Sequence, residues 1–439
     1  MRDLLLCALF ALLIGGCAYK KPAPLTTEEL APFLKNDPAS LSPKEHSRLY
    51  ADFLQKRYTP WLLNRVDTAS SSVTWAIRYY EKRTLFGENR LPLLKSRWSR
   101  WIENSNYDAL NRMKRHAVTI RPSNLRLFPS ERPIFFDPSS AGEGYPFDYN
   151  QNSAIKAFTP LLVSHLSRDG GWAFVQTPFA LGWLKIEDIA FVSQKQIDRI
   201  MKMPMVTVVK EGAALYDGKQ NFLFYAKTAT LFPLIREEDG FYRILVPKEI
   251  DRQARFEESL IPLTWAKRMP LSFDRTNIAL IASGLLGEPY GWGGVAQDRD
   301  CSAMTRDFFA PFGIWLPRNS KAQAKVGKVI SLKGLSKREK ERVIIKNGIP
   351  FLTLVHLPGH IMLYVGTKNK NAYVMHNIWG IRTEDGGRYL IAKAVITRLD
   401  LGMEIPEADK KSLPIERIDS MNIPIYPASG EISTSLPRL

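Results

Sequence analysis

The sequence predicts an α+β protein in which a helical segment and two small β-barrels precede a domain of mixed helices and strands. Three successive patterns along the 439 residues predict this class. Apolar residues first recur at helical spacing, then β-branched and aromatic runs alternate with turn residues, and the last third mixes both patterns. The predicted boundaries are 1–17 for a signal peptide, 18–43 for a tether, 44–116 for the helical segment, 117–195 and 196–265 for the barrels, 274–402 for the mixed domain and 403–439 for a tail to which we assign no function.

The first residues are typical of a secretory signal peptide. Arg2 precedes an apolar run from Leu4 to Ile14, which is too short to span a bilayer as a helix. The ending Gly15-Gly16-Cys17 resembles the lipobox of bacterial lipoproteins, which implies that Cys17 is acylated. We therefore expect an exported protein, held by lipid on a bacterial envelope membrane and facing the periplasm or cell wall. The alternative is a buried N-terminal helix.

The chain is strongly basic, with 61 Lys plus Arg against 44 Asp plus Glu and a formal charge of +17. Such a charge favours anionic partners, which are nucleic acid, anionic lipid or the acidic polymers of a cell envelope. Export favours the last two, so we expect no nucleic-acid partner. The densest basic stretch, 333–348, is predicted to be a solvated helical face.

Two stretches of the β-rich region repeat one element. LVSHLSRDGGWAFVQ (162–176) aligns with LFPLIREEDGFYRILV (231–246), and Gly171 pairs with Gly240. Both read as a strand, an acidic-glycine turn and an aromatic-led strand. Both resemble bacterial SH3-like domains, which implies two small barrels in tandem. Upstream, Leu49, Phe53 and other aromatic residues of the helical segment are predicted to be core.

Cys301 is the one free thiol that the processed chain would keep, because Cys7 lies in the signal peptide and Cys17 would carry lipid. Asp298 or Asp300 can cap the helix that follows, so Cys301 falls in its first turn. There the helix dipole favours a thiolate, the reactive form of cysteine. The alternative is a small buried apolar residue.

Two histidines downstream could serve this thiol as a base. A five-residue loop at 366–370 would place His360 opposite His376 on one face of a β-hairpin. One imidazole could take the thiol proton while the other orients it. The alternatives are ordinary half-buried histidines or a zinc site, and the single cysteine disfavours zinc. His356 is predicted to be structural.

Four motifs in order resemble the NlpC family of cell-wall cysteine peptidases. They are GEPYGWGGVAQDRDCSAM, LPRNSKAQ, LPGHIMLYVG and VMHNIWG, within about 275–400. The resemblance implies a circularly permuted papain-like fold, with Cys301 as nucleophile, His360 as base and His376 as the orienting residue. It also implies substrate binding or support of the site by Asp300, Ser302, Tyr290 and Trp292, and a structural role for Arg318, Ser320 and Gln323. The basic insert at 333–348 departs from the family pattern.

The expected activity is that of a γ-D-glutamyl-L-diamino acid endopeptidase acting on peptidoglycan stem peptides or muropeptide fragments. The resemblance implies that neither metal nor cofactor takes part, and we expect a monomer. Asp300 could pair with the free amine of an N-terminal L-alanine, or could only cap the helix. Two alternatives stay open for the protein. One is a non-catalytic peptidoglycan-binding lipoprotein, and the other is an amidase or acyltransferase of the same superfamily.

Overall fold

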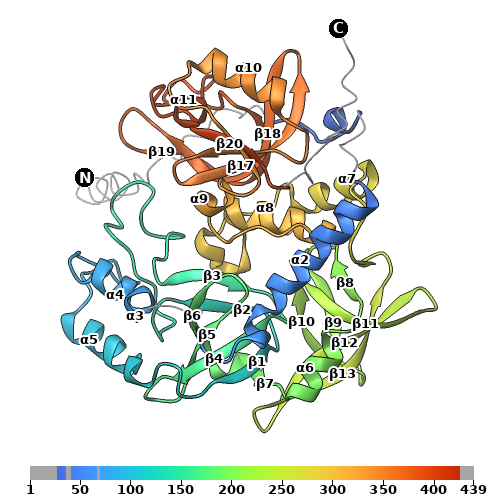
Figure 1. The fold of residues 1–439 in the computed structure, drawn as a ribbon. Coiled ribbons are helices and arrows are strands. Elements are labelled where there is room, and N and C mark those ends of the chain that lie inside the picture. Colours follow the sequence, from blue (N-terminus) through green and yellow to red (C-terminus); the bar gives the residue numbers. More distant parts are fainter. Residues whose placement is uncertain (1–26, 36–40, 67–69, 426–439) are drawn as a thin grey trace, which may run out of the picture.

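The structure, a computed structural model, describes residues 27–35, 41–66 and 70–425 (Figure 1). The predicted signal peptide and Cys17 lie outside these residues. Within the described ranges, no helix is both long and apolar enough to cross a membrane. Two β units lie on one side of α8 (Cys301–Phe309), and an α/β layer lies on its other side (Figure 1). The resulting α+β architecture is the predicted class.

The N-terminal helices connect the two halves of the molecule. The longest, α2 (Pro43–Leu62), begins at a capping box in which Ser42 and Glu45 bind each other's backbone N–H groups. Leu49 of α2 packs into the core around α8, whereas Trp61 packs into the core of the second β unit. The other elements of the segment are η1 (Ala31–Leu34), α3 (Ser70–Val73), α4 (Trp75–Tyr80), α5 (Lys95–Asn104) and η2 (Tyr107–Ala109).

The described part of the predicted tether packs against the C-terminal domain. Phe33 of η1 lies 5.0 Å from the ring of Tyr373, measured between ring centroids, and belongs to the core of that domain. Glu28 pairs with Lys368 at 2.7 Å. The prediction of a tether with at most one short helix over 18–43 is therefore right about the helix, which is η1, but wrong in treating residues 27–34 as a linker, because Leu30 and Phe33 are buried in the core of this domain.

Two antiparallel β units follow, and each buries its own core. The repeated sequence element forms the β4–β5 hairpin in the first unit and the β11–β12 hairpin in the second. The first unit contains β1 (Arg115–Thr119), β2 (Ser123–Arg126), β3 (Gln151–Ile155), β4 (Pro160–Leu166), β5 (Trp172–Gln176), β6 (Leu181–Lys185), η3 (Ile186–Asp188) and β7 (Ile189–Phe191). After α6 (Gln194–Ile200), the second contains β8 (Met205–Val208), β9 (Ala213–Tyr216), β10 (Phe222–Ala226), β11 (Leu231–Glu238), β12 (Phe241–Ile250), β13 (Gln253–Pro262) and β14 (Ala266–Arg268). We call these units the first and second barrels.

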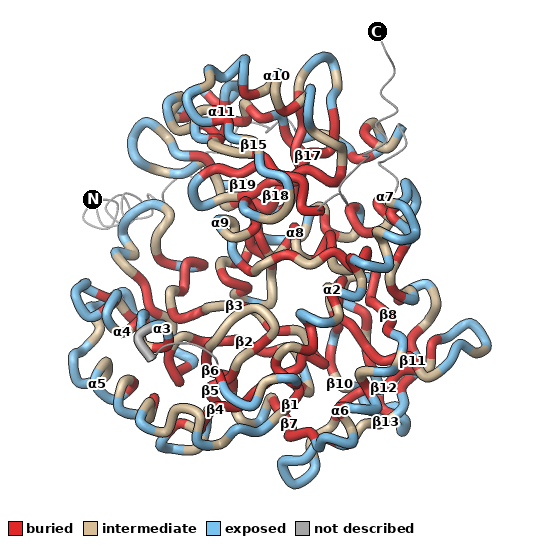
Figure 2. The backbone as a smooth tube through the Cα atoms, viewed as in Figure 1, coloured by how far each residue is buried: buried red, intermediate tan, exposed pale blue. Residues whose placement is uncertain are grey.

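The C-terminal domain is a six-stranded sheet of order β15-β20-β16-β17-β18-β19 with helices on both faces. One core lies between the sheet and α7 and α8, and the other lies beneath α10 and α11. The backbone of the buried residues in this domain is drawn in red in Figure 2. The elements are α7 (Arg275–Leu285), η4 (Trp292–Gln297), α8, η5 (Ala310–Phe312), α9 (Ser320–Gln323), β15 (Lys328–Ser331), α10 (Lys337–Asn347), β16 (Leu354–Leu357), β17 (His360–Lys368), β18 (Asn371–Arg382), β19 (Arg388–Arg398), α11 (Pro414–Arg417) and β20 (Ser420–Ile423).

The predicted tail is part of this domain, so its assignment to residues 403–439 is wrong over the described stretch. β20 lies between β15 and β16 and pairs with both. Met421 and Ile423 of this strand are both buried, Met421 in the core beneath α10 and α11 and Ile423 in the core around α8. The sequence pattern missed the strand because it is only four residues long and is followed directly by Pro424.

Candidate active site

Cys301 is the first residue of α8 and is 7% exposed. Asp300 is the N-cap, as predicted, and its carboxylate accepts a hydrogen bond from the Ala303 N–H at 2.8 Å. Burial and the nearby Asp300 carboxylate raise the pKa of Cys301 to about 12, although the backbone N–H groups of Ile361 and Ser302 act to lower it. The thiol therefore lies against the strand residue that follows His360. Burial thus acts against the thiolate that the helix start is expected to favour.

The two predicted histidines meet, but in a different register from the one expected. The β17–β18 turn has two residues, Asn369 and Lys370, both with positive φ, instead of a five-residue loop. Pairing then shifts at a bulge around Val365, so that Leu363 faces Met375. By this register His360 lies diagonally across from His376 rather than opposite it. A two-residue turn without the bulge would have placed them on opposite faces, since side chains alternate along a strand.

Hydrogen bonds define the direction of this histidine pair. Nε2 of His360 lies 2.9 Å from Nδ1 of His376, and Nε2 of His376 lies 3.0 Å from Oγ1 of Thr397. The Thr397 hydroxyl donates its single proton to the carbonyl of Arg398 at 3.2 Å. It must then accept from His376 Nε2–H, so His376 Nδ1 accepts from His360 Nε2–H. This tautomer leaves Nδ1 of His360 free to accept a proton.

Both imidazoles are neutral in the folded protein. Burial lowers the pKa of His360 to about 4, and the charge of Arg417 acts in the same direction. Burial lowers the pKa of His376 well below its usual value, and a charge on His360 would lower it further. A neutral imidazole beside a neutral thiol is competent to accept the proton only as the sulfur attacks.

Asp300 is also one half of a buried ion pair with Arg318. The guanidinium meets both carboxylate oxygens, at 3.1 and 2.8 Å, and donates to the Ser302 hydroxyl at 2.9 Å. Burial would raise the pKa of Asp300, but Arg318 and the hydrogen bonds hold it below its usual value. Arg318 Nε donates to Ser153 of β3 at 2.7 Å, so the same side chain joins the site to the first barrel.

Gln323 of α9 contacts the first turns of α8. Gln323 is fully buried, and its amide donates to the carbonyls of Ser302 and Pro317, both at 2.9 Å. It accepts from the Thr305 hydroxyl at 2.7 Å. Ser320 is the first residue of α9, whose N-cap is Asn319. The hydrogen bonds of Gln323 thus connect the first turn of α8 to the loop that precedes α9.

An aromatic wall, defined as Phe147, Tyr149, Tyr290, Trp292 and Trp379, extends from this site to the first barrel. Phe147 lies 5.4 Å from Trp292 and 5.6 Å from Trp379, between ring centroids. Tyr290 lies 5.8 Å from Trp379, and burial raises its pKa well above the usual value. The predicted residues Tyr290 and Trp292 thus share this wall with a loop of the first barrel.

The glycine loop before Cys301 permits a close approach to that barrel. Gly294 has φ of +91°, and a Cβ there would lie 2.4 Å from the Ala154 nitrogen of β3. Asn377 of β18 fixes the ends of the loop by donating to the carbonyls of Pro289 and Arg299, at 3.2 and 2.9 Å. The nucleophile helix is therefore held from the sheet and from the barrel.

Sequence reasoning missed Thr397, Asn377, Arg417 and the barrel aromatics. Asn377 follows His376 within the VMHNIWG motif, so its position was the available signal. Thr397 lies in a plain β run, and Arg417 acts on His360 from the predicted tail. Only the strand pairing and the chain's return through β20 bring these residues to the histidines.

This fold, with a cysteine at a helix start beside a histidine-bearing sheet, is that of a papain-like cysteine peptidase. Residues 287–378 match the NlpC/P60 family, residues 133–185 match the SH3 domain of SH3b1 type, and residues 6–110 match the N-terminal NLPC_P60 stabilising domain. The chain thus carries an NlpC/P60 domain together with an SH3b domain and a stabilising domain. Enzymes of the NlpC/P60 family are cysteine-type hydrolases.

An NlpC/P60 endopeptidase of Photobacterium damselae subsp. piscicida has the same fold, with a TM-score of 0.81 over 92% of this chain and 99% of that one, at 23% identity. The γ-D-glutamyl-L-lysine dipeptidyl-peptidase of Bacillus subtilis is 30% identical over 29% of this chain and 41% of its own. The Bacillus cereus protein of that name is 25% identical over 43% of this chain and 54% of its own. The chain thus spans about half the length of these curated relatives, or less.

Proposed function

We propose that the protein is a γ-D-glutamyl-L-diamino acid endopeptidase that cleaves peptidoglycan peptides with Cys301, His360 and His376. The observation that carries this proposal is the His360–His376 hydrogen bond beside the first turn of α8, with Nδ1 of His360 left as an acceptor. The names of the two Bacillus relatives support the choice of bond.

In the proposed mechanism, Cys301 Sγ attacks the γ-carbonyl carbon as His360 Nδ1 takes the thiol proton. His376, itself held by Thr397, orients the His360 imidazolium that results through the hydrogen bond between the two rings. The imidazolium protonates the leaving amine, the amide C–N bond breaks, and a thioester remains on Cys301. Water then attacks the thioester and gives one proton to His360; the C–S bond breaks, His360 returns that proton to the sulfur, and the new γ-carboxylic acid and the thiol are released.

The aromatic wall favours short peptides over stems still attached to glycan. It joins the first barrel to the loop that precedes Cys301, so one end of the substrate region is bounded by bulky rings. We infer that a free amino end is preferred there. Asp300 already caps α8 and pairs with Arg318, so we assign it first to holding the site. Equal rates on free and N-acetylated L-Ala-γ-D-Glu-diamino acid peptides would contradict the preference.

Digestion of purified muropeptides, followed by the masses of the products, tests the activity. The proposal predicts that a diamino acid or a peptide beginning with one is released from the γ-carboxyl of D-glutamate. Binding without cleavage would indicate a peptidoglycan-binding protein. Cleavage or acyl transfer at another bond would indicate an amidase or acyltransferase of the same superfamily.

We further propose that Cys17 carries a lipid that holds the enzyme on an envelope membrane. The apolar run that ends at Gly15-Gly16-Cys17 motivates this proposal. Fractionation after labelling with a fatty acid compares the wild type with Cys17→Ser. The variant is expected to lose the label and to leave the membrane fraction with unchanged activity on soluble peptides. Unchanged membrane association of unlabelled protein would contradict acylation.

A further inference from the structure

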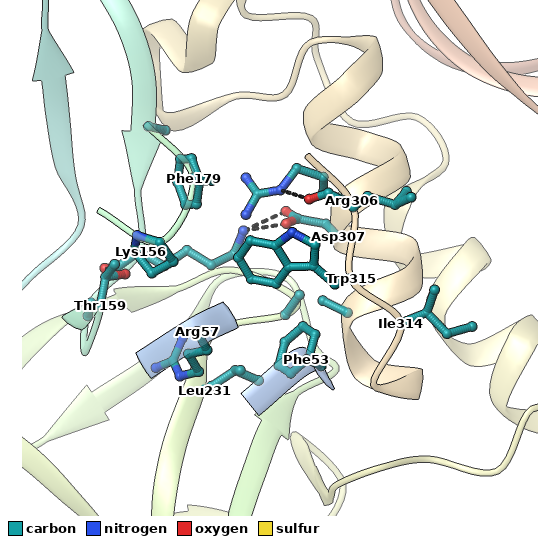
Figure 3. Close-up of a pocket in the computed structure, with 16 residues that line it drawn as sticks. Phe53, Arg57, Lys156, Thr159, Phe179, Leu231, Arg306, Asp307, Ile314 and Trp315 are labelled. Atoms are coloured by element: carbon teal, nitrogen blue, oxygen red, sulfur yellow. Dashed lines mark hydrogen bonds and ion pairs between the residues drawn. The ribbon is translucent and has the colours of Figure 1, made fainter. Parts of the chain in front are cut away.

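Two adjoining cavities lie where both barrels meet α8. The larger has a volume of about 300 Å³ and the smaller about 70 Å³. Their walls share Ala154, Lys156, Arg306 and Asp307, so we treat them as one cavity. None of the three proposed catalytic residues lines it. Figure 3 shows the smaller part, in which Lys156 and Phe179 of the first barrel face Arg306 and Asp307 of α8.

The walls of the smaller part carry more positive than negative charge. Its cations are Arg57, Lys156 and Arg306, and Asp307 supplies the one carboxylate among its lining residues. That carboxylate is already bound twice by Lys156 Nζ, at 2.6 and 2.7 Å, and by Arg299 Nε at 2.7 Å. It therefore has little capacity left to neutralise the two arginines.

Arg306 presents its guanidinium to the cavity, where the charge of Asp307 acts on it without a direct ion pair between the two. Its Nε donates to the carbonyl of Leu316 at 3.2 Å, and its central carbon lies 3.9 Å from the centroid of the Phe179 ring. Among the described residues, no carboxylate forms an ion pair with it. Burial lowers the pKa of Arg306 to about 10, which leaves the group charged at neutral pH. A bound anion would offset the cost of burying this charge.

Arg57 adds a further cation to the cavity walls, and its hydrogen bonding is incomplete. It is a buried residue of α2 that also lines the cavity. Its Nη2 donates to the carbonyl of Phe158 at 2.6 Å, but its Nε has no hydrogen-bond partner in the described part of the chain. Buried guanidinium nitrogens are normally bonded, and each lone donor is costly.

We propose that this cavity binds a small organic carboxylate, held between Arg306 and Lys156. The guanidinium fork matches the two oxygens of a carboxylate, and the ammonium keeps a third proton to donate. The remaining walls suit a short apolar body, and about 300 Å³ is at the lower end of small-ligand cavities. Phe53, Leu231, Ile314 and Trp315 are apolar residues that line the smaller part. A ligand there would join both barrels to the helix that carries Cys301.

Thermal unfolding of the full chain with sodium butyrate, at ionic strength held constant with sodium chloride, tests the site. The wild type is expected to show a saturable rise of its unfolding midpoint, and Arg306→Gln to lose at least about tenfold in apparent affinity. Arg338→Gln removes the same charge from the exposed face of α10 and is expected to respond like the wild type. Calorimetric titration of butyrate gives the dissociation constants directly.

Additional variants and a second anion define where butyrate binds and which anion the cavity prefers. Cys301→Ala is expected to keep the full butyrate response, because the cavity is separate from the catalytic thiol. If Arg306→Gln fails to fold, Arg306→Lys serves instead and is expected to bind several-fold more weakly, since it lacks the fork. A response to phosphate but not to butyrate would overturn the proposal in favour of an inorganic oxyanion. A butyrate response equal to that of chloride, or retained without Arg306, would overturn it entirely.

Discussion

Thr397 Oγ1 lies 3.0 Å from Nε2 of His376 and accepts its proton, because its own hydroxyl proton is donated to the carbonyl of Arg398. This one contact sets the tautomer of both histidines, since His376 Nδ1 must then accept from His360. The reverse arrangement would place a proton on His360 Nδ1 and would leave no base for the thiol. A threonine on β19 thus determines which imidazole nitrogen is able to react.

We expect Thr397→Val to lower kcat by roughly tenfold, the effect of one lost orienting hydrogen bond, with little change in KM. Steady-state kinetics on a defined peptide measure both constants. Thr397→Ser keeps the hydroxyl and is expected to restore most of kcat, which a purely packing role would not require. A Thr397→Val enzyme with wild-type kcat would show that the tautomer is fixed in another way.

His376→Ala is expected to lower turnover strongly, yet less than His360→Ala. His360 exchanges the proton itself, whereas His376 only orients it through the 2.9 Å hydrogen bond. Single-turnover rates of the two variants and the wild type check this order. Equal losses would place both histidines in the proton transfer, and an active His360→Ala would remove it from the role of base.

The pH dependence of kcat/KM follows from the buried pair. Burial lowers the pKa of His360 to about 4, so the base is unprotonated above that pH and activity falls only as pH drops through about 4. Burial raises the pKa of Cys301 to about 12, so ionisation of the thiol is not expected to change kcat/KM near neutral pH. A pH profile of kcat/KM measures this. An acid limb near 6.5, the ordinary value for histidine, would contradict the neutral pair.

Asp300→Asn is expected to destabilise the fold, because it leaves the guanidinium of Arg318 buried without its carboxylate. Breaking a buried ion pair from one side typically costs about 3–5 kcal/mol of unfolding free energy. Denaturant unfolding measures the change. Asp298→Asn is the matched control, since its pair with Lys227 at 3.1 Å is partly exposed and is expected to contribute about 1 kcal/mol or less. Equal stability of both variants would contradict a structural role for Asp300.

The sequence predicted the helix start at Cys301 and the shared face of the histidines because both depend on local pattern. The cap at Asp300 and the even spacing of His360 and His376 are visible without any tertiary contact. The spacing correctly predicted that the two histidines share a face of the hairpin, but the predicted register was wrong. The turn is shorter than expected, and the bulge around Val365 brings both histidines back to one face.

What the sequence could not supply is the pairing of distant strands and the effect of burial. Thr397 reaches His376 only through the β18–β19 register, and Phe147 reaches Trp292 only because a barrel loop extends to the catalytic domain. Burial acts against the thiolate expected at the helix start, and no sequence pattern reports desolvation.

The mass of the enzyme trapped during turnover tests the central claim most directly. The wild type is mixed with an L-Ala-γ-D-Glu-diamino acid peptide, quenched in acid within the first turnover, and its intact and peptide masses are measured. We predict an added L-Ala-γ-D-Glu acyl group on the peptide that contains Cys301, with no adduct and no hydrolysis in a folded Cys301→Ala variant. An adduct on another residue, or cleavage by Cys301→Ala at the wild-type rate, would contradict the mechanism.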